Sequence, residues 1–253
     1  MIRYKNAKQI EGIRKSCRLL CAMYKDLQGK VVPGVSTLEL DLWAQKWIKS
    51  NGAKPAFLGY GPKRNPFPGA LCISINDEVI HGIPSKRKIK SGDLVGIDSG
   101  INLDGFISDK TITFEAGKVS DSAHKLNVVT RECLYKGIAA AVAGARLNSI
   151  GSAVEEHATE FGYGIVSEFS GHGVGLDVHE DPAVYNIRHG GLNPRLREGM
   201  VLAIEPMINM GSGDIEILED DWTVVTADGK LSSHWEHTIA IFSDHTEILT
   251  EDE

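Results

Sequence analysis

The stretch LVGIDSGINLDGFISDKTITF, residues 94–114, decides the fold of this chain. It predicts a β-hairpin, because apolar residues lie on both sides of Asp104-Gly105, a dipeptide that two-residue turns prefer. Each arm carries an acid, Asp98 or Asp109, among residues that we expect to be buried. Carboxylates are rarely buried unless they are paired, hydrogen-bonded or bound to a metal ion. The hairpin therefore raises the question of what stabilises its two carboxylates in a buried position.

The register of this hairpin places both acids on one face. With the turn at 104–105, Asp109 pairs with Gly100, which lies two residues after Asp98. The acids are then diagonal neighbours, roughly 7–8 Å apart between Cα atoms. Two carboxylates so placed repel each other and raise one pKa, and a cation between them removes the conflict. The alternative is that one acid caps a turn and the other faces solvent.

The composition is that of an ordinary globular protein. Of the 253 residues, 42% are apolar and 24% are charged, which suits one large domain or two small ones. The net charge of −7 argues against a dedicated nucleic-acid binder. The four cysteines form no CxxC motif, so we expect reduced thiols and a cytoplasmic protein. We expect no signal segment and no membrane span.

Helices and strands are predicted to follow the same order in two halves. Each half reads as two helices, a glycine-rich loop and strands that carry acids, with a period near 110 residues, between VVPGVS around residue 34 and AVAGAR around residue 144. This order indicates an internal duplication, and the alternative is a chance likeness of two α+β halves. The predicted helices are 6–29, 36–52, 120–144 and 149–162, and the predicted strands are 71–75, 93–101, 106–114, 200–210 and parts of 222–242.

The second half adds two acids and two histidines. Glu205 lies inside an apolar run, MVLAIEPMINM, and Glu236 begins another in HWEHTIAIF. His172 and His179 lie in SGHGVGLDVHEDP, whose glycines allow a close approach of the backbone. His81, in NDEVIHGIP, is a weaker candidate by itself. Each of these residues alone is more often structural or solvent-facing, so the interpretation depends on the set.

Four carboxylates and one imidazole form an oxygen-rich set of ligands. Such a set favours Mn, Fe or Co over a structural zinc ion bound by thiolates. Carboxylates can bridge two ions about 3.5–4 Å apart, and such a site can generate hydroxide near neutral pH and polarise a carbonyl. The set therefore indicates a hydrolase.

Together, these motifs resemble those of the type I methionine aminopeptidases of peptidase family M24. CISINDEVIHGIP, the acid hairpin, SGHGVGLDVHEDP, LAIEPMIN and WEHTIAIF occur in the order of that family, and the likeness covers nearly the whole chain. The resemblance implies an α+β pita-bread fold with internal pseudo-twofold symmetry, in which helices cover a central antiparallel sheet. It also implies that residues 1–253 form a single catalytic domain.

The resemblance implies metal-dependent removal of the initiator methionine from nascent proteins and peptides, with a small residue preferred after Met. It implies two divalent ions, Co, Mn or Fe. Asp98 would bind one ion, Asp109 and Glu236 would bridge both, and His172 and Glu205 would bind the other. A water that bridges the ions would attack the peptide, with Glu205 as its proton shuttle.

The resemblance also assigns roles near the substrate. His179 would stabilise the tetrahedral intermediate and contact the substrate carbonyl, and His81 would interact with the next peptide nitrogen. The pocket for the methionine side chain is expected to comprise Tyr60, Phe67, Cys72 and Trp222.

Four departures from the family pattern bear on the shape of the pocket. Lys110 stands where a small hydroxyl residue is usual, and the loop 61–66 is longer. Phe67 replaces a tyrosine, and Val178 replaces a phenylalanine, which would widen the pocket. These departures concern the pocket and leave the expected metal ligands in place.

The alternatives are another M24 exopeptidase, such as a Xaa-Pro aminopeptidase or a prolidase, and a non-enzymatic pita-bread binding protein. Prolidases and aminopeptidase P carry an additional N-terminal domain, for which the segment before Asp98 leaves little room. Type II methionine aminopeptidases carry an insertion that the segment between His179 and Glu205 cannot hold. Binding proteins of this fold have lost ligands, whereas all five are present here.

The basic run PSKRKIKSGD, residues 84–93, is expected to be a solvated loop. The alternative is ribosome contact, because bacterial enzymes that resemble this chain act on nascent polypeptides. We expect a monomer without direct recognition of nucleic acid.

Overall fold

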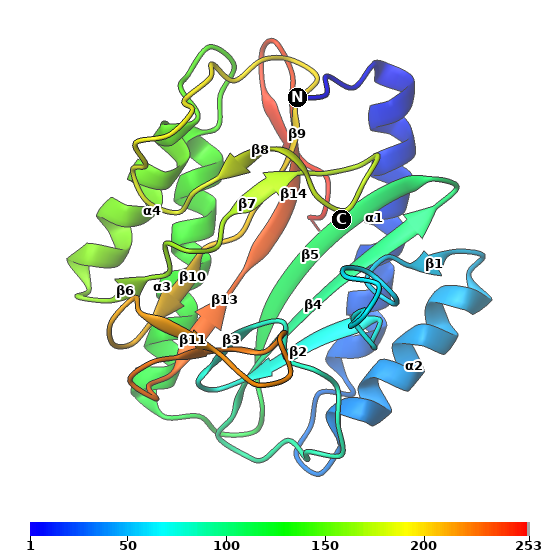
Figure 1. Ribbon diagram of the computed structural model, residues 1–253, viewed down its shortest axis with the longest axis vertical. Coiled ribbons are helices and arrows are strands. Elements are labelled where there is room, and N and C mark those ends of the chain that lie inside the picture. The colour runs from blue at the N-terminus through cyan, green and yellow to red at the C-terminus, as the bar shows by residue number, and fades with distance from the viewer. Residues whose placement is uncertain (252–253) are drawn as a thin grey trace.

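The structure, a computed structural model, describes residues 1–251 and contains helices on either side of a large central sheet (Figure 1). The helices are α1 (Ala7–Gln28), α2 (Thr37–Ser50), α3 (Asp121–Ala140) and α4 (Asn148–Glu160). The strands are β1 (Lys54–Pro55), β2 (Leu71–Ile75), β3 (Glu78–Ile80), β4 (Leu94–Leu103), β5 (Phe106–Glu115), β6 (Gly164–Ile165), β7 (Gly171–Gly173), β8 (Glu180–Val184), β9 (Val201–Ile204), β10 (Met207–Asn209), β11 (Ile215–Ile217), β12 (Val224–Thr226), β13 (Ser232–His234), β14 (Glu236–Ile241) and β15 (Thr246–Ile248).

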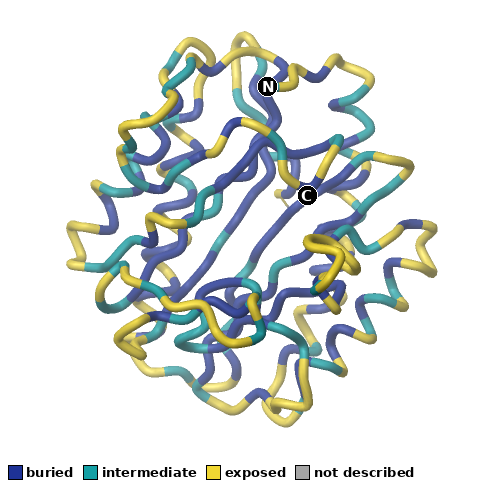
Figure 2. The backbone as a smooth tube through the Cα atoms, in the orientation of Figure 1, coloured by how far each residue is buried: buried dark blue, intermediate teal, exposed yellow. Residues whose placement is uncertain are grey.

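Nine of the strands within residues 1–251 form one antiparallel sheet. Its order is β1-β4-β5-β14-β9-β7-β8, with β2 beside β4 and β15 beside β14. Two three-stranded sheets, β13-β10-β6 and β11-β12-β3, lie at its margin. Figure 2 shows the middle strands buried and the outer loops and helix surfaces exposed. This α+β architecture agrees with the predicted class.

The order of elements repeats in the two halves of the chain. In the first half, α1 and α2 precede the hairpin β4–β5, and α1 packs on both strands. In the second half, α3 and α4 precede β9 and β14, and α3 packs on both of these. Figure 1 shows one helix pair on each side of the view, with α1 and α2 beside the first-half strands and α3 and α4 beside the second-half strands.

The connections between the paired helices also match. Gly34 has φ 97°, and its N–H donates to the carbonyl of Ile89 at 2.8 Å. Gly144 has φ 87°, and its N–H donates to the carbonyl of Leu196 at 2.8 Å. Positive φ favours glycine at both sites. The predicted helix 120–144 ends at Ala140, because the chain turns there into this connection.

The predicted starts of the first two helices are confirmed. The Asn6 side chain accepts from the N–H of Gln9 at 2.9 Å, and the Gln9 side chain accepts from the N–H of Asn6 at 3.0 Å. Ser36 and Glu39 form the same reciprocal pair at the start of α2. Each capping residue contributes about 1 kcal/mol, so the local sequence fixes where these helices begin.

The hairpin has the predicted register. Asp104 and Gly105 form its turn with φ 53° and 87°, which fits a type I′ turn. Asp109 pairs with Gly100, and both acids consequently point to one face of the sheet.

The apolar run 200–210, predicted as one strand region, divides into two strands. β9 ends at Ile204 and stays in the large sheet, whereas β10 begins at Met207 and belongs to a different sheet. Pro206 causes the break because it has no N–H to donate to a neighbouring strand. Glu205 therefore lies at the open end of β9.

Two further observations concern the chain as a whole. Among residues 1–251, none of the helices combines the length and apolar composition that crossing a bilayer requires. The four cysteines, all within the described part of the chain, are buried and form no disulfide.

A buried ion pair joins the N-terminal segment to the glycine-rich loop. Lys5 Nζ lies 2.9 Å from Glu180 Oε2, and both side chains are only 1% exposed. The other oxygen of Glu180 accepts from the backbone N–H groups of Leu176 and Asp177 at 2.8 and 3.1 Å. Glu180 thus organises the loop that carries His179, and Lys5 balances its charge.

Replacing Lys5 tests this link. Lys5→Met should lower the free energy of unfolding by about 3 kcal/mol, because it leaves the buried carboxylate of Glu180 without a cation. Urea denaturation provides the measurement. Lys8→Met, at an exposed position of the same segment, should change the stability by less than about 0.5 kcal/mol. Equal effects of the two substitutions would contradict the structural role of the pair.

Candidate metal centre

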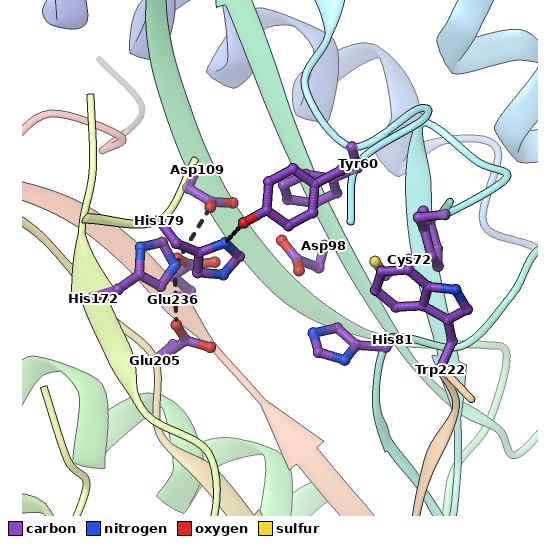
Figure 3. Close-up of a pocket in the computed structure, with 12 residues that line it drawn as sticks. Tyr60, Cys72, His81, Asp98, Asp109, His172, His179, Glu205, Trp222 and Glu236 are labelled. Atoms are coloured by element: carbon purple, nitrogen blue, oxygen red, sulfur yellow. Dashed lines mark hydrogen bonds and ion pairs between the residues drawn. The ribbon is translucent and has the colours of Figure 1, made fainter. Parts of the chain in front are cut away.

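One pocket gathers every residue that the sequence predicted for the site (Figure 3). Its acids come from strands of the large sheet or their ends, its histidines from β7 and two loops, and its aromatic side chains from the loop before β2 and, for Trp222, from the segment before β12. The lining residues are Phe57, Tyr60, Phe67, Cys72, His81, Asp98, Asp109, His172, His179, Glu205, Trp222 and Glu236.

Strand pairing brings three of the acids together. Asp98 lies on β4, Asp109 lies on β5, and Glu236 begins β14 directly opposite Thr111 of β5. The Thr111 hydroxyl donates to Glu236 Oε2 at 2.9 Å, which fixes the orientation of that carboxylate. One oxygen each of Asp98, Asp109 and Glu236 is buried without a hydrogen-bond partner. These orphaned acceptors face the same pocket.

Glycines allow His172 to reach the acids from a third strand. A Cβ at Gly171 would lie 2.3 Å from the carbonyl oxygen of Ala203, and one at Gly173 would lie 2.4 Å from that of Asp181. Only glycine permits β7 to pack this closely between β8 and β9. The close approach places His172 Nε2 3.4 Å from Glu205 Oε1 and 3.8 Å from Asp109 Oδ2.

The backbone fixes the tautomer of His172. Its Nδ1 lies 2.9 Å from the carbonyl oxygen of Gly173, so Nδ1–H donates and Nε2 keeps its lone pair. Burial lowers the pKa of His172 to about 3, which keeps the ring neutral. A neutral imidazole whose other nitrogen is fixed by a carbonyl is the usual form of a metal-binding histidine.

The environment of the pocket raises the pKa values of its four carboxylates. Burial raises the pKa of Asp98 to about 6, against the opposing effects of His234 and Thr111. Burial, followed by repulsion from neighbouring carboxylates, raises the pKa values of Asp109, Glu205 and Glu236 well above the ordinary range. Four carboxylates that cannot all ionise in a dry pocket require a proton or a cation between them.

The geometry fits a metal ion. Ligand atoms of Asp109, His172 and Glu236 lie within 4.8 Å of one another, and all three residues are buried. Asp98 and Glu205 line the same pocket, although they lie outside this closest trio. Oxygen-rich donors with one imidazole suit a divalent metal ion.

His81 occupies a strained backbone position. Its φ is 59°, in the left-handed region that non-glycine residues rarely adopt, and such strain concentrates at functional sites. Its ring packs edge-on against Phe169 and Trp222. Burial lowers the pKa of His81 to about 4, so the ring enters the pocket as a neutral imidazole.

An apolar wall closes the side of the pocket next to the acids. Phe67 packs edge-on against Trp222 with ring centroids 5.2 Å apart, and Cys72 lies opposite Asp98 in the β2–β4 pair. The loop 61–66 supports this wall, because the Trp222 indole N–H donates to the carbonyl of Asn65 at 3.1 Å. This loop, which we expect to be longer than is usual in the family, thus contacts a residue of the pocket.

The other departures lie behind the pocket. Val178 is buried in the hydrophobic cluster that includes Ile13 of α1, and it is absent from the lining residues. Val178 therefore does not widen the pocket through a place in its lining. Lys110 points to the helix-covered face of β5, where its Nζ lies 3.6 Å from Cys21 Sγ. Phe67, in contrast, lines the pocket.

Two neighbours of the site were not predicted from the sequence. His234 is 3% exposed, and its Nε2 lies 3.5 Å from Glu205 Oε2. Its place two residues before Glu236 was an available signal, because alternate residues of a strand share a face. Phe57 adds an aromatic ring to the lining and carried no comparable signal.

Comparisons with known proteins show which family the chain resembles. The profile of metallopeptidase family M24 matches residues 11–242. A methionine aminopeptidase of Treponema pallidum is 50% identical over 252 residues, which cover 99% of this chain and 97% of that protein. The crystal structure of methionine aminopeptidase from Rickettsia prowazekii superposes with a TM-score of 0.95 at 36% identity, covering 99% of this chain and 100% of that one.

A prolidase shares the fold over part of its length. The prolidase from Pyrococcus furiosus superposes with a TM-score of 0.80 at 26% identity, covering 99% of this chain but 66% of the prolidase. The pita-bread fold predicted from the sequence is thereby confirmed. The chain therefore belongs to the metallopeptidase family M24, among its methionine aminopeptidases.

Proposed function

We propose that the protein removes the N-terminal methionine from nascent proteins and peptides in a metal-dependent hydrolysis, with a preference for a small residue after Met. The observation that carries this proposal is the buried trio Asp109, His172 and Glu236 beside an apolar aromatic wall. The trio offers ligands for a metal ion that would promote hydrolysis, and the wall offers a surface for an apolar side chain of the substrate. The names of the relatives support the substrate.

The ligands divide between two divalent ions, Co, Mn or Fe. Asp98 would hold one ion, His172 and Glu205 would hold the other, and Asp109 and Glu236 would hold both. The orphaned carboxylate oxygens and the lone pair on His172 Nε2 support this division. Bound divalent ions supply Lewis acidity, which lowers the pKa of a water molecule and polarises a carbonyl.

The protein's own groups move the protons and bind the peptide. Glu205 accepts the proton of the attacking water and passes it to the leaving amine, a role that suits a carboxylate whose pKa is raised by burial. His179 donates to the oxygen of the scissile carbonyl, and His81 contacts the following peptide nitrogen. Burial lowers the pKa of both histidines, so both act as neutral rings.

The apolar wall recognises the methionine side chain. Phe67, Cys72 and Trp222 offer polarisable surface, which suits a thioether. Tyr60 closes the mouth of this pocket. Such pockets discriminate by about 1–3 kcal/mol per methylene, so Met should be preferred strongly over Ala, with some cleavage after similar side chains.

The same proposal covers partners and location. We infer a cytoplasmic monomer, one catalytic domain over residues 1–253, that meets nascent chains as they leave the ribosome. The buried thiols support a reducing compartment. Lys86, Arg87 and Lys88 are exposed on one loop and provide a basic surface for ribosome contact.

Peptide hydrolysis tests the function directly. Metal-stripped protein, reloaded with Mn, Fe or Co under anaerobic conditions, should release Met from Met-Gly-Met-Met and leave Ala-Gly-Met-Met, Xaa-Pro-Gly and Gly-Pro intact. Chromatography of the products measures this. Cleavage of the proline peptides would move the assignment to the prolidases. Absence of cleavage with every metal would support the binding protein instead.

The acid cluster predicts how stability depends on pH and metal. The folded-state pKa of Asp98, about 6, lies above its ordinary value of 3.8, so the folded protein binds more protons between these values. Metal-free protein should therefore lose stability as the pH rises through this window. Mn²⁺ at a hundredfold excess over its Kd should raise the Tm by about 5–10 °C at pH 7.5, and by less at pH 5, where protons compete.

Asp109→Asn provides the control for this experiment. The variant keeps the shape of the side chain but loses a charge of the cluster, so Mn²⁺ should stabilise it much less, and it should hydrolyse Met-Gly-Met-Met at a small fraction of the wild-type rate. An unchanged gain in Tm together with full activity would contradict the assignment of the ligands.

Ribosome contact is tested by charge reversal. Replacing Lys86, Arg87 and Lys88 with Glu should abolish co-sedimentation with ribosomes at low salt, because phosphate contacts depend on cationic side chains. Hydrolysis of free Met-Gly-Met-Met should stay unchanged, since the loop lies outside the pocket. Unaltered co-sedimentation would reject the contact.

A further inference from the structure

Tyr60 contacts a histidine in addition to closing the pocket. Its hydroxyl lies 2.7 Å from His179 Nδ1, and the two ring centroids are 5.3 Å apart. Figure 3 shows Tyr60 reaching across the pocket to His179 from the loop before β2. A wall residue would need no such hydrogen bond, so the contact requires another explanation.

The loop holds Tyr60 in place through its backbone. The N–H of Tyr60 donates to the carbonyl of Phe57 at 2.9 Å, and the N–H of Phe67 donates to the carbonyl of Tyr60 at 2.8 Å. The N–H of Gly59 donates to the carbonyl of Phe67 at 2.9 Å. The loop is therefore closed at its base on both sides of Tyr60, whatever the length of the insertion at 61–66. On the other side of the contact, Glu180 and Lys5 fix the loop of His179.

The direction of this hydrogen bond decides whether Nε2, the other ring nitrogen of His179, carries a proton or a lone pair. A neutral imidazole carries one N–H and one lone pair, and the partner of one nitrogen sets the state of the other. An imidazole nitrogen is a much stronger base than a phenol oxygen, so the bond is strongest with the tyrosine as donor. Nδ1 then accepts, and Nε2 must carry the proton.

His172 provides the opposite case within the same pocket. Its Nδ1 faces a carbonyl oxygen, which can only accept, so its Nε2 holds a lone pair. The two rings lie 4.2 Å apart between centroids, yet their Nδ1 partners give their Nε2 atoms opposite character. One Nε2 is suited to bind a cation, and the other is suited to donate to an oxygen.

We propose that Tyr60 is a positioning residue: its hydroxyl donates to Nδ1 of His179 and thereby keeps a proton on Nε2, which donates to the carbonyl oxygen of the substrate. A preorganised donor at this oxygen stabilises the charge that develops there in the transition state. The role rests on the proposed peptidase function, but the tautomer of His179 is a property of the protein alone and can be measured without turnover.

The first test is the tautomer itself. Long-range ¹H–¹⁵N NMR on protein labelled at histidine and loaded with Zn²⁺, a diamagnetic ion, distinguishes Nδ1–H from Nε2–H, and His179→Ala identifies the His179 signals. The wild type should show the Nε2–H form. Tyr60→Phe should shift His179 toward a mixture of both forms, whereas Tyr163→Phe, outside the pocket, should leave it unchanged. An Nδ1–H form in the wild type would overturn the proposal.

The second test separates positioning from pocket packing. Tyr60→Phe should lower kcat for Met-Gly-Met-Met by about tenfold to a hundredfold, while KM changes by less than about threefold, because the ring remains. In a His179→Ala background, Tyr60→Phe should have no further effect on kcat. A rise in KM alone, or an equal loss of kcat in both backgrounds, would assign Tyr60 to the pocket wall. A wild type that releases no Met would refute the function and leave the NMR result standing.

Discussion

The repulsion among four buried carboxylates is the constraint on which the rest of this structure depends. Asp98, Asp109, Glu205 and Glu236 share one dry pocket in which they cannot all be charged without a cation. The surrounding features serve this arrangement. Thr111 orients Glu236, glycines admit β7, and Pro206 ends β9 so that Glu205 faces the pocket. Burying the acids costs folding free energy, and the binding of a cation offsets this cost.

Neutral histidines complete the site. A charged imidazole beside the acids would pair with them and compete with a metal ion, and burial prevents this by lowering the pKa values of His81, His172 and His234. The ring nitrogens are then distinguished only by their hydrogen-bond partners. A backbone carbonyl at His172 and a phenol at His179 are small local differences with large chemical consequences.

Local rules predicted much of this structure from the sequence. The turn at 104–105 and the period of two in a strand placed Asp98 and Asp109 on one face, and the caps fixed the starts of two helices. These rules did not predict contacts between segments that lie far apart in the sequence. Thr111 and Glu236 lie 125 positions apart, and their pairing follows from tertiary packing. The contact between Tyr60 and His179 was missed for the same reason, whereas His234 was missed although its place two residues before Glu236 was an available signal. The expected effect of Val178 was not found at the pocket because packing beneath α1 decides its place.

The division of the site between the two halves has a consequence for biosynthesis. The hairpin β4–β5 can form as soon as it has emerged, but the edge of β5 that receives β14 stays open until the second half has been translated. During that interval Asp98 and Asp109 lie without His172, Glu205 and Glu236, which have not yet been translated. The acid cluster, and with it the candidate metal site, is therefore complete only in the assembled chain.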